Sequence, residues 1–299
     1  MVCGLGLAMT HLSPTVNAWV IAPDIMFWMV IHCFRIFLKM VFIHLNQVSK
    51  TYGSETVALK PTSLTIDPGT FTVILGPSGA GKSTLLRMIN GLETPTTGEV
   101  VVQGQRLSSR NLRRVRSRTA MIFQQFNLVG RLNVMTNVLT GRCYYRPWWT
   151  SALYLFNRQD MERAHWALSR VGLTEKAWER TDQLSGGQQQ RVAIARALCQ
   201  EPTVILADEP VASLDPISSE EVMGLLREIC QQDGITIVAN LHQVDLAMRY
   251  ADRIVGLNKG EIVFDGGPTE LAQNERTLNT IYQREDIHGG EGLEVATAY

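Results

Sequence analysis

The sequence predicts an α/β fold: a mixed β-sheet whose strands alternate with helices, a small antiparallel β part, and an inserted α-helical subdomain. Three uninterrupted apolar, β-rich runs, at residues 70–75, 203–208 and 234–241, have the composition of strands that are buried on both faces of a sheet. Residues 127–197 instead carry few turn signals and a helical hydrophobic periodicity. We therefore expect a helical subdomain at about 127–197, inserted between the first two buried strands of the core.

The segments around these runs supply the remaining elements. Short strands are predicted at residues 41–45 and 63–66, before a turn at Asp67-Pro68-Gly69. The first buried run leads through a glycine-rich loop into KSTLLRMIN, an amphipathic helix that Gly91 can end. Two short strands around Asn258-Lys259-Gly260 predict a β-hairpin.

Composition bounds the size of the core and the class of partner. The chain has 299 residues, 45% of them hydrophobic, which is ample for a large globular core. Its formal net charge of +0 gives no overall signature of nucleic-acid binding, so no nucleic-acid partner is expected. Residues 106–118 are a local exception, with several arginines and no acid. A solvated helix face is the favoured interpretation there, and a phosphate-binding patch is the alternative.

The two ends of the chain differ from the rest. Residues 1–39 are rich in large apolar side chains, but proline and charged residues interrupt them, so they make a poor membrane span and lack the features of a signal peptide. We expect an N-terminal extension that precedes the natural start at Met40, with a weak membrane-surface anchor as the alternative. Residues 40–285 then form one domain, and residues 286–299 form a flexible tail.

A glycine-rich loop joins the first buried strand to the helix that follows it. Its sequence, GPSGAGKST, matches the G-x-x-x-x-G-K-[ST] pattern of phosphate-binding P-loops. Glycines let successive N–H groups turn toward a phosphate, and the helix directs the positive end of its dipole at the same anion. Lys82 can reach the β- and γ-phosphates of ATP, and the Ser83 hydroxyl can bind Mg²⁺. The expected nucleotide-binding residues of this loop are Gly76, Pro77, Ser78, Gly79, Ala80, Gly81, Lys82, Ser83 and Thr84.

An acidic pair ends the second buried strand. Asp208, at the carboxyl end of the strand, can hold Mg²⁺ directly or through water. Glu209 is placed to orient the attacking water or to accept its proton. Capping of the next helix is the alternative role for this pair. With the P-loop present, the pair predicts a site that hydrolyses a nucleotide.

A third motif, LSGGQ at residues 184–188, begins a helical stretch with two adjacent glycines. The ordered set of P-loop, glutamine, LSGGQ and Asp-Glu resembles the ATP-binding subunits of ABC transporters, over nearly all of residues 41–282. The resemblance implies a head-to-tail homodimer. In such a dimer, Ser185, Gly186 and Gly187 of one subunit contact the γ-phosphate held by the partner's P-loop, and Gln188 is a further nucleotide-binding residue.

Other site residues follow from the same resemblance. Tyr52 resembles the aromatic residue that stacks on adenine, with an ordinary strand-end aromatic as the alternative. Gln124 resembles the Q-loop glutamine that touches Mg²⁺ and water, although the neighbouring Gln125 leaves the register open. Asp215, in Ser-Leu-Asp, belongs to a D-loop-like motif. His242 resembles the switch histidine near the γ-phosphate, although this chain has Leu-His-Gln where the family has Thr-His-Asp.

Longer stretches of the chain closely resemble the ATPases of phosphonate importers, and an aromatic segment at residues 144–159 is similar to the longer helical insert of that family. The resemblance implies a peripheral ATPase on the cytoplasmic face of the cell (inner) membrane. Its implied partners are transmembrane permease subunits and, indirectly, a substrate-binding protein. The aromatic segment either faces the permease or packs within the helical subdomain. An importer of phosphate, phosphite or another small solute is the alternative, and a non-transport ABC ATPase acting on nucleic acid or ribosomes is a distant one.

Overall fold

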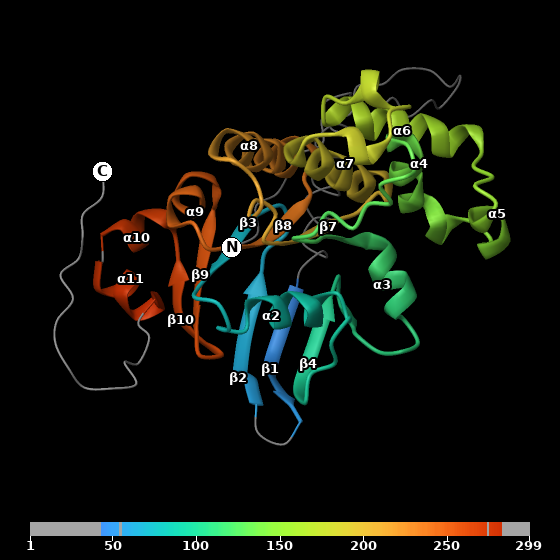
Figure 1. Ribbon diagram of the computed structural model, residues 1–299. Helices are drawn as coiled ribbons and strands as arrows, with labels where there is room; N and C mark the ends of the chain where they lie inside the picture. The colour runs from blue at the N-terminus through green and yellow to red at the C-terminus, as the bar shows by residue number, and fades with distance from the viewer. Residues whose placement is uncertain (1–42, 54–55, 274, 283–299) are drawn as a thin grey trace, which may run out of the picture. The chain divides into compact units, whose positions relative to one another are not determined.

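The computed structural model describes residues 43–53, 56–273 and 275–282, which are drawn in colour in Figure 1. The expected N-terminal extension, Met40 and the expected flexible tail lie outside the described residues. In the described part, the chain forms two β-sheets with helices packed on them. None of the helices in these ranges combines the length and the apolar character that a membrane crossing requires.

The smaller sheet is antiparallel and has the strand order β2-β1-β4-β5. Its strands are β1 (Ile43–Tyr52), β2 (Thr56–Ile66), β4 (Thr97–Val102) and β5 (Gln105–Arg106). β1 and β2 extend well past the short strands expected at 41–45 and 63–66. One face of this sheet is polar and partly exposed, so the longer strands alternate in hydropathy and an apolar run marks only a part of each.

The larger sheet is mixed and has the strand order β10-β9-β3-β8-β7-β6. Its strands are β3 (Phe71–Leu75), β6 (Thr119–Ile122), β7 (Val204–Asp208), β8 (Thr236–Leu241), β9 (Arg253–Asn258) and β10 (Glu261–Gly266). All are parallel except β10, which turns back against β9 at the expected hairpin. The three apolar runs form β3, β7 and β8, and every residue of these strands is buried. The expected mixed α/β fold is confirmed.

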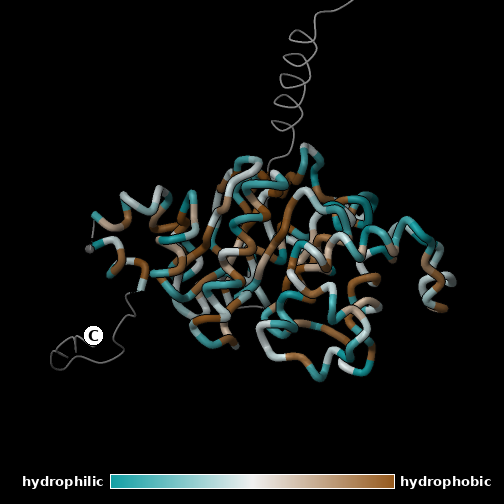
Figure 2. The backbone as a smooth tube through the Cα atoms, turned by 90° about the horizontal axis from the view of Figure 1, so that it is seen from above, coloured by the Kyte–Doolittle hydropathy of each residue, from teal (hydrophilic) through white to brown (hydrophobic). Residues whose placement is uncertain are grey.

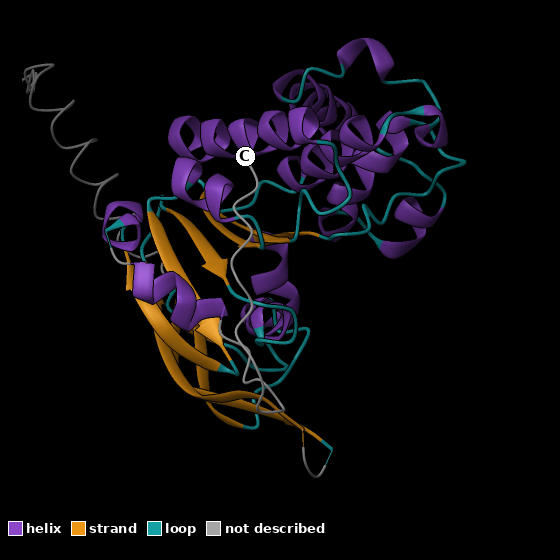
Figure 3. Cartoon of the chain, turned by 60° about the vertical axis from the view of Figure 1, so that its left-hand side comes forward, coloured by secondary structure: helices purple, strands orange, loops and turns teal. Residues whose placement is uncertain are grey.

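Helices cover both faces of the larger sheet. Between β6 and β7 lie α4 (Val134–Leu139), η1 (Thr140–Tyr145), α5 (Trp148–Ala152), α6 (Arg158–Arg170), η2 (Thr174–Lys176), η3 (Thr181–Gln183) and α7 (Gly186–Cys199). The other helices are α2 (Lys82–Ile89), α3 (Leu112–Arg118), α8 (Pro216–Asp233), α9 (Val244–Tyr250), α10 (Pro268–Ala272) and α11 (Glu275–Tyr282). Figure 3 shows a large group of helices apart from the strands, and the labels of Figure 1 place α4, α5, α6 and α7 in that group. The segment expected to be a helical subdomain therefore contains helices, while its limits as a subdomain stay a prediction.

Apolar side chains of the larger sheet alternate between two cores. Phe71, Val73 and Leu75 of β3 pack with the helices that follow β6, β7 and β8. Ile74, between them, packs with α2 and the smaller sheet. Figure 2 shows many hydrophobic stretches of the backbone in the interior of the described chain and many hydrophilic stretches along its outside. Because parallel strands end at the same edge of a sheet, the loops after β3, β7 and β8 lie together, and ligands of α/β sheets bind at that edge.

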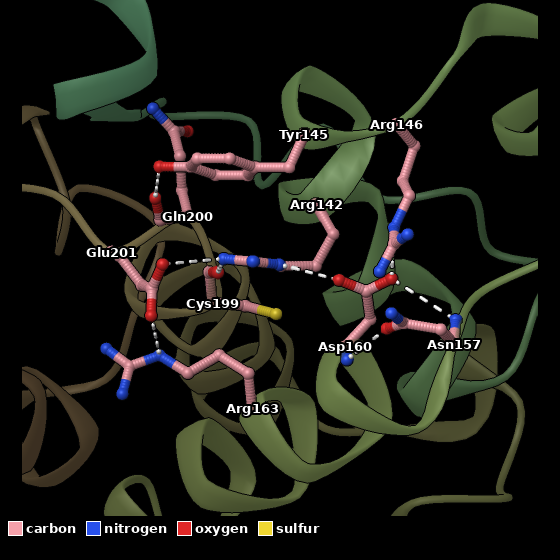
Figure 4. A network of polar contacts seen from close by, with 9 residues as sticks. All are labelled: Arg142, Tyr145, Arg146, Asn157, Asp160, Arg163, Cys199, Gln200 and Glu201. Atoms are coloured by element: carbon pink, nitrogen blue, oxygen red, sulfur yellow. Dashed lines mark hydrogen bonds and ion pairs between the residues drawn. The ribbon is translucent and has the colours of Figure 1, made fainter.

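A buried ion network fixes the helices that precede β7 (Figure 4). Asp160 is fully buried and accepts hydrogen bonds from Arg142 Nε at 3.0 Å and Arg146 Nε at 2.6 Å. Burial by itself would raise the pKa of Asp160, but the two arginines hold that pKa below its usual value. Asn157 and Asp160 also form the capping box that begins α6. Residues 147–156 are therefore held at both ends, by Arg146 and by Asn157.

Candidate functional site

The glycine-rich loop between β3 and α2 has a backbone that only glycine can adopt at two positions. Gly76 has a φ of 153°, and a Cβ atom there would lie 2.1 Å from the carbonyl oxygen of Leu257. Gly81 has a φ of 102°, and a Cβ atom there would lie 2.4 Å from the carbonyl oxygen of Ala58. Gly81 also caps α2 without a side chain, and the first turn of α2 contains no acid. The N–H groups at the start of α2 are therefore available to an anion.

Lys82 lies over this loop and is almost fully buried. Its Nζ donates hydrogen bonds to the carbonyl oxygens of Gly76 at 2.7 Å and Pro77 at 3.0 Å. Burial lowers the pKa of Lys82, while the nearby carboxylates of Glu209 and Asp208 act in the opposite direction. A buried ammonium whose partners are carbonyl oxygens is ready to pair with a more strongly charged oxygen ligand, such as a phosphate.

Two oxygen ligands suited to Mg²⁺ meet beside Lys82. The Ser83 hydroxyl, in the first turn of α2, donates a hydrogen bond to Asp208 Oδ1 at 2.8 Å. Asn240 Nδ2, from the neighbouring strand β8, donates to the same carboxylate oxygen at 2.8 Å. Mg²⁺ is usually held by one or two protein oxygens together with waters and substrate phosphates. A hydroxyl and a carboxylate at this separation fit that requirement. No cluster of three or more acidic, histidine or cysteine ligands occurs within the described residues.

Glu209 and His242 lie together at the ends of β7 and β8. His242 Nε2 is 2.6 Å from Glu209 Oε1, and because a carboxylate only accepts, the imidazole donates this hydrogen bond. Glu209 adopts a left-handed backbone with a φ of 52°. The sequence placed these two residues in one site from separate motifs, and the structure brings their side chains into direct contact.

The LSGGQ residues begin α7 with a capping box. Ser185 Oγ accepts from the Gln188 backbone N–H at 3.3 Å, and Gln188 Oε1 accepts from the Ser185 N–H at 3.1 Å. Gly186 and Gly187 follow in the first turn of α7, and among the described hydrogen bonds their N–H groups have no acceptor. Sequence analysis assigned Ser185 and Gln188 to the nucleotide. Within one chain these two residues bind each other, and the two glycines present the free donors.

The remaining candidates are more dispersed. Gln124 lines a cleft of about 540 Å³ with Gln189 and Ser213, and no described hydrogen bond joins Gln124 to Ser83 or Asp208. Tyr52 is 38% exposed at the end of β1, with Lys50 Nζ at 4.9 Å from its ring centroid. Asp215 caps α8 by accepting from the Ser218 N–H at 2.9 Å, and hydrogen bonds from Ser218 lower the pKa of Asp215. These three roles at the nucleotide stay predictions.

Sequence reasoning missed Asn240, which is fully buried and lies opposite Asp208 in the β7–β8 ladder. Its signal was available, because an asparagine near the end of the apolar run at 234–241 needs a polar partner once it is buried. The partner depends on how β7 and β8 pair, and the sequence does not give that register. Asn240 holds the carboxylate of Asp208 in place beside Ser83.

With this geometry described, comparison with known proteins is decisive. A family model described as "ABC transporter" matches residues 59–212. The chain belongs to the ATP-binding subunits of ABC transporters. A phosphonates import ATP-binding protein, PhnC 2, of Trichodesmium erythraeum (strain IMS101) is 70% identical over 257 residues, which cover 86% of this chain and 99% of that protein. A phosphonates import ATP-binding protein, PhnC, of Thiobacillus denitrificans (strain ATCC 25259 / T1) is 62% identical over 257 residues, 86% of this chain and 98% of that protein.

Solved structures of ABC cassettes have the same fold. A dimeric, post-hydrolysis cassette bound to ADP and phosphate has 38% sequence identity and a TM-score of 0.66, and the match covers 76% of this chain and 98% of that one. A CbiO1 subunit from Clostridium perfringens, part of a CbiONQ transporter complex, has 30% identity and a TM-score of 0.70, covering 80% of this chain and 95% of that one. The family model matches a region of this ABC cassette that contains the P-loop, β7 and all the described helices before β7.

Proposed function

We propose that this chain is the ATP-hydrolysing subunit of an ABC importer and that a head-to-tail pair of chains couples ATP binding and hydrolysis to the uptake of phosphonates. One observation supports the paired site above all. Both α2 and α7 start at glycines and present backbone amides that have no described acceptor, and no described hydrogen bond joins these two helix starts to each other. A γ-phosphate between α2 of one copy and α7 of another satisfies both sets of donors.

Different residues of the site bind the phosphates, hold the metal ion and activate the attacking water. The P-loop amides and Lys82 bind the β- and γ-phosphates, and Ser83 and Asp208 hold Mg²⁺. When bound, the ion would supply positive charge against the charge that develops on the phosphates. Glu209 orients the attacking water and takes its proton. His242 holds the Glu209 carboxylate through their hydrogen bond, and Gln124, Tyr52 and Asp215 complete the nucleotide site as the resemblance implies.

Separate permease subunits and a substrate-binding protein complete the importer, with this chain on the cytoplasmic face of the cell (inner) membrane. The segment 147–156, which we call the aromatic segment core, supports a permease contact. Its side chains include Trp148, 81% exposed, and Trp149, 52% exposed, although Arg146 and Asn157, which both bind Asp160, hold the two ends of the segment. Large apolar side chains that are held in place and exposed to solvent are typical of a binding surface. Internal packing is therefore not supported for these two tryptophans.

Phosphonate is the proposed solute because the curated relatives above carry that name. Phosphate, phosphite or another small solute is the alternative. Assembling the chain with its permease and binding protein in vesicles, and comparing ATP-dependent uptake of methylphosphonate with that of phosphate, distinguishes them. Uptake of phosphate without uptake of methylphosphonate contradicts the proposed solute and leaves the ATPase assignment intact.

The shared site is tested with Glu209→Gln. Loss of a general base lowers a rate by about 10²–10⁴-fold, whereas the amide retains the size of the side chain and leaves the phosphate donors in place. The variant should therefore bind ATP and remain paired. Size-exclusion chromatography with saturating ATP should show a dimer for Glu209→Gln and mostly monomer for the parent chain.

A second substitution provides the control for this experiment. Ser185→Arg, added to Glu209→Gln, blocks the α7 donors that belong to the partner's nucleotide but leaves the chain's own P-loop unchanged. The double variant should bind ATP and elute as a monomer. A double variant that dimerises as well as Glu209→Gln does, or a Glu209→Gln variant that stays monomeric at saturating ATP, contradicts the shared site.

A further inference from the structure

The arginine-rich stretch at 106–118 carries positive charge that the fold leaves largely uncompensated. Its arginines are Arg106, Arg110, Arg113, Arg114, Arg116 and Arg118. Within the described residues, the ion pair of Arg106 with Glu99 is the only one that these six side chains make. Arg116 and Arg118 instead donate to backbone oxygens of other segments. The interpretation as a solvated helix face does not account for the cavity beside this stretch.

A cavity of about 270 Å³ lies where α3, the β4–β5 turn and η1 meet. It is lined by Gln103, Gln105, Arg114, Val115, Ser117, Arg118, Tyr144 and Tyr145. None of these residues is acidic, and two are arginines. The volume is below the range of about 300–1,000 Å³ that is usual for sites of drug-sized ligands. The cavity therefore suits a small anion and its waters better than a nucleotide.

Contacts outside the cavity fix its walls in place. Arg118 donates to the backbone oxygen of Glu201 at 3.3 Å, and the Tyr145 hydroxyl donates to the backbone oxygen of Gln200 at 3.1 Å. Gln103 donates to the Thr203 hydroxyl. Glu201, whose backbone oxygen Arg118 contacts, has its carboxylate paired with Arg142 and Arg163 (Figure 4). The Glu201 carboxylate is therefore already paired with other arginines and leaves the positive charge of the cavity in place.

Arg114 is the exception among the charged side chains of the wall. No hydrogen bond or ion pair of its guanidinium occurs in the described part of the chain. It stands four residues before Arg118 on α3, a spacing at which two like charges on a helix repel each other. A doubly charged anion between the two guanidinium groups replaces that repulsion with two charge-assisted interactions.

We propose that this cavity binds a small tetrahedral oxyanion of the phosphate or phosphonate type, clamped by Arg114 and Arg118. The anion joins α3 to η1, and α3 continues without a break into β6, which ends two residues before Gln124. Binding therefore stiffens the segment that leads into the candidate nucleotide site. The proposal does not depend on which solute is transported, or on whether the chain pairs with a second copy.

Calorimetric titration tests the site directly. The full chain is first saturated with ADP and Mg²⁺ so that the P-loop is occupied, and methylphosphonate or inorganic phosphate is then added at constant ionic strength. We expect one binding event per chain. Tighter binding of methylphosphonate identifies an imported-solute type of ligand, and tighter binding of phosphate identifies the product ion of ATP hydrolysis. The absence of heat from either anion overturns the proposal.

Two variants distinguish anion binding by Arg114 and Arg118 from a general effect of surface charge. Arg114→Gln with Arg118→Gln should weaken binding at least about 100-fold, about tenfold for each charged donor lost. Arg110→Gln removes an exposed arginine of the same stretch that does not line the cavity, and it should change the affinity less than about twofold. An equal loss of anion affinity in both variants means that binding depends only on net charge, and the proposed site is then rejected.

Hydrogen exchange on the parent chain gives a readout that needs no substitution. Saturating anion should slow amide exchange in α3 and η1, on the two sides of the cavity, and leave exchange in α11 unchanged. If the anion is bound but neither α3 nor η1 is protected, it lies elsewhere on the chain, and the proposed site is wrong even if the arginine variants fold poorly.

Discussion

The starts of α2 and α7 are both glycine-containing helix N-termini, but they satisfy their backbone donors differently. α2 begins after Gly81, with no side-chain cap and no acid in its first turn. α7 begins after Ser185, whose capping box with Gln188 satisfies the N–H groups of these two residues. The donors at the start of α2 are therefore left to a bound anion or to water. The start of α7 is stable by itself and has only the amides of Gly186 and Gly187 left for one.

This difference leads us to expect that the P-loop, rather than the start of α7, is the primary nucleotide site of the chain. The P-loop combines free amides with the Lys82 ammonium and the Ser83–Asp208 pair. The α7 site offers amides without a comparable metal site. Its two free donors can complete a site that already holds a phosphate but are a poor primary site.

The largest expected effect is at α2. Lys82→Ala removes the charge that the uncapped loop offers to the phosphates, so ATP hydrolysis should fall by at least about 10³-fold. The fold should persist, because a lysine whose pKa is lowered by burial contributes little to stability. Phosphate release assays measure the rate of ATP hydrolysis, and circular dichroism measures whether the fold persists. The exposed Lys60, paired with Glu261, provides the control Lys60→Ala. Unchanged turnover in Lys82→Ala removes the P-loop assignment.

The next effect concerns the network that supports α7 independently of any nucleotide. Asp160→Asn leaves Arg142 and Arg146 without their shared carboxylate, and breaking a buried ion pair costs about 3–5 kcal/mol of unfolding free energy. Denaturant unfolding measures this loss. Glu162→Gln, which breaks only the exposed pair with Arg158, should cost less than about 1 kcal/mol. Equal losses in the two variants contradict a stabilising role for the buried network.

The same network gives a pH dependence. Because the pKa of Asp160 is lowered in the folded chain, its contribution to stability is fully present above the unfolded value of about 3.9 and is lost as the pH falls through the folded value. The parent chain should lose stability in acid more steeply than Asp160→Asn does. Parallel acid unfolding curves for the two proteins contradict this expectation.

A smaller effect is expected at the cap of α7. Ser185→Ala removes one half of the capping box, which should lower the unfolding free energy by about 0.5–2 kcal/mol. ATP affinity of the monomer should be unchanged, because the chain's own P-loop does not use Ser185. Ser185→Thr keeps the hydroxyl and should retain most of the stability. A loss of monomer ATP affinity in Ser185→Ala indicates that α7 and the P-loop interact within one chain.

The smallest effect on the isolated cassette is expected at the aromatic segment core. Trp148→Ala with Trp149→Ala removes exposed side chains, so stability should change by less than about 0.5 kcal/mol and basal ATPase should be unchanged. Transport in vesicles with the permease should nevertheless be lost. Trp178→Ala, which is 65% exposed but outside the segment, is the matched control. Intact transport in the double variant contradicts the permease contact.

The sequence predicted those parts of the fold and site that depend on residues close together in the chain. The glycines at 76 and 81, the buried runs that became β3, β7 and β8, and the β9–β10 hairpin are all local in sequence. The contact between His242 and Glu209, and that between Asn240 and Asp208, depend on how β7 and β8 pair, which is a long-range property. The capping box at Ser185 was different, because Ser-x-x-Gln at a helix start is a local signal that the sequence analysis did not use.

The backbone conformation of Glu209 has a consequence for the stability of the chain. A non-glycine residue with a φ of 52° is held in a conformation that costs about 1–3 kcal/mol. Glycine at position 209 would relieve that strain while removing the carboxylate that faces His242. The glutamate therefore lowers the stability of the fold, and we attribute its presence to the role proposed for its carboxylate. In the proposed mechanism, position 209 gives up some stability of the fold for activity.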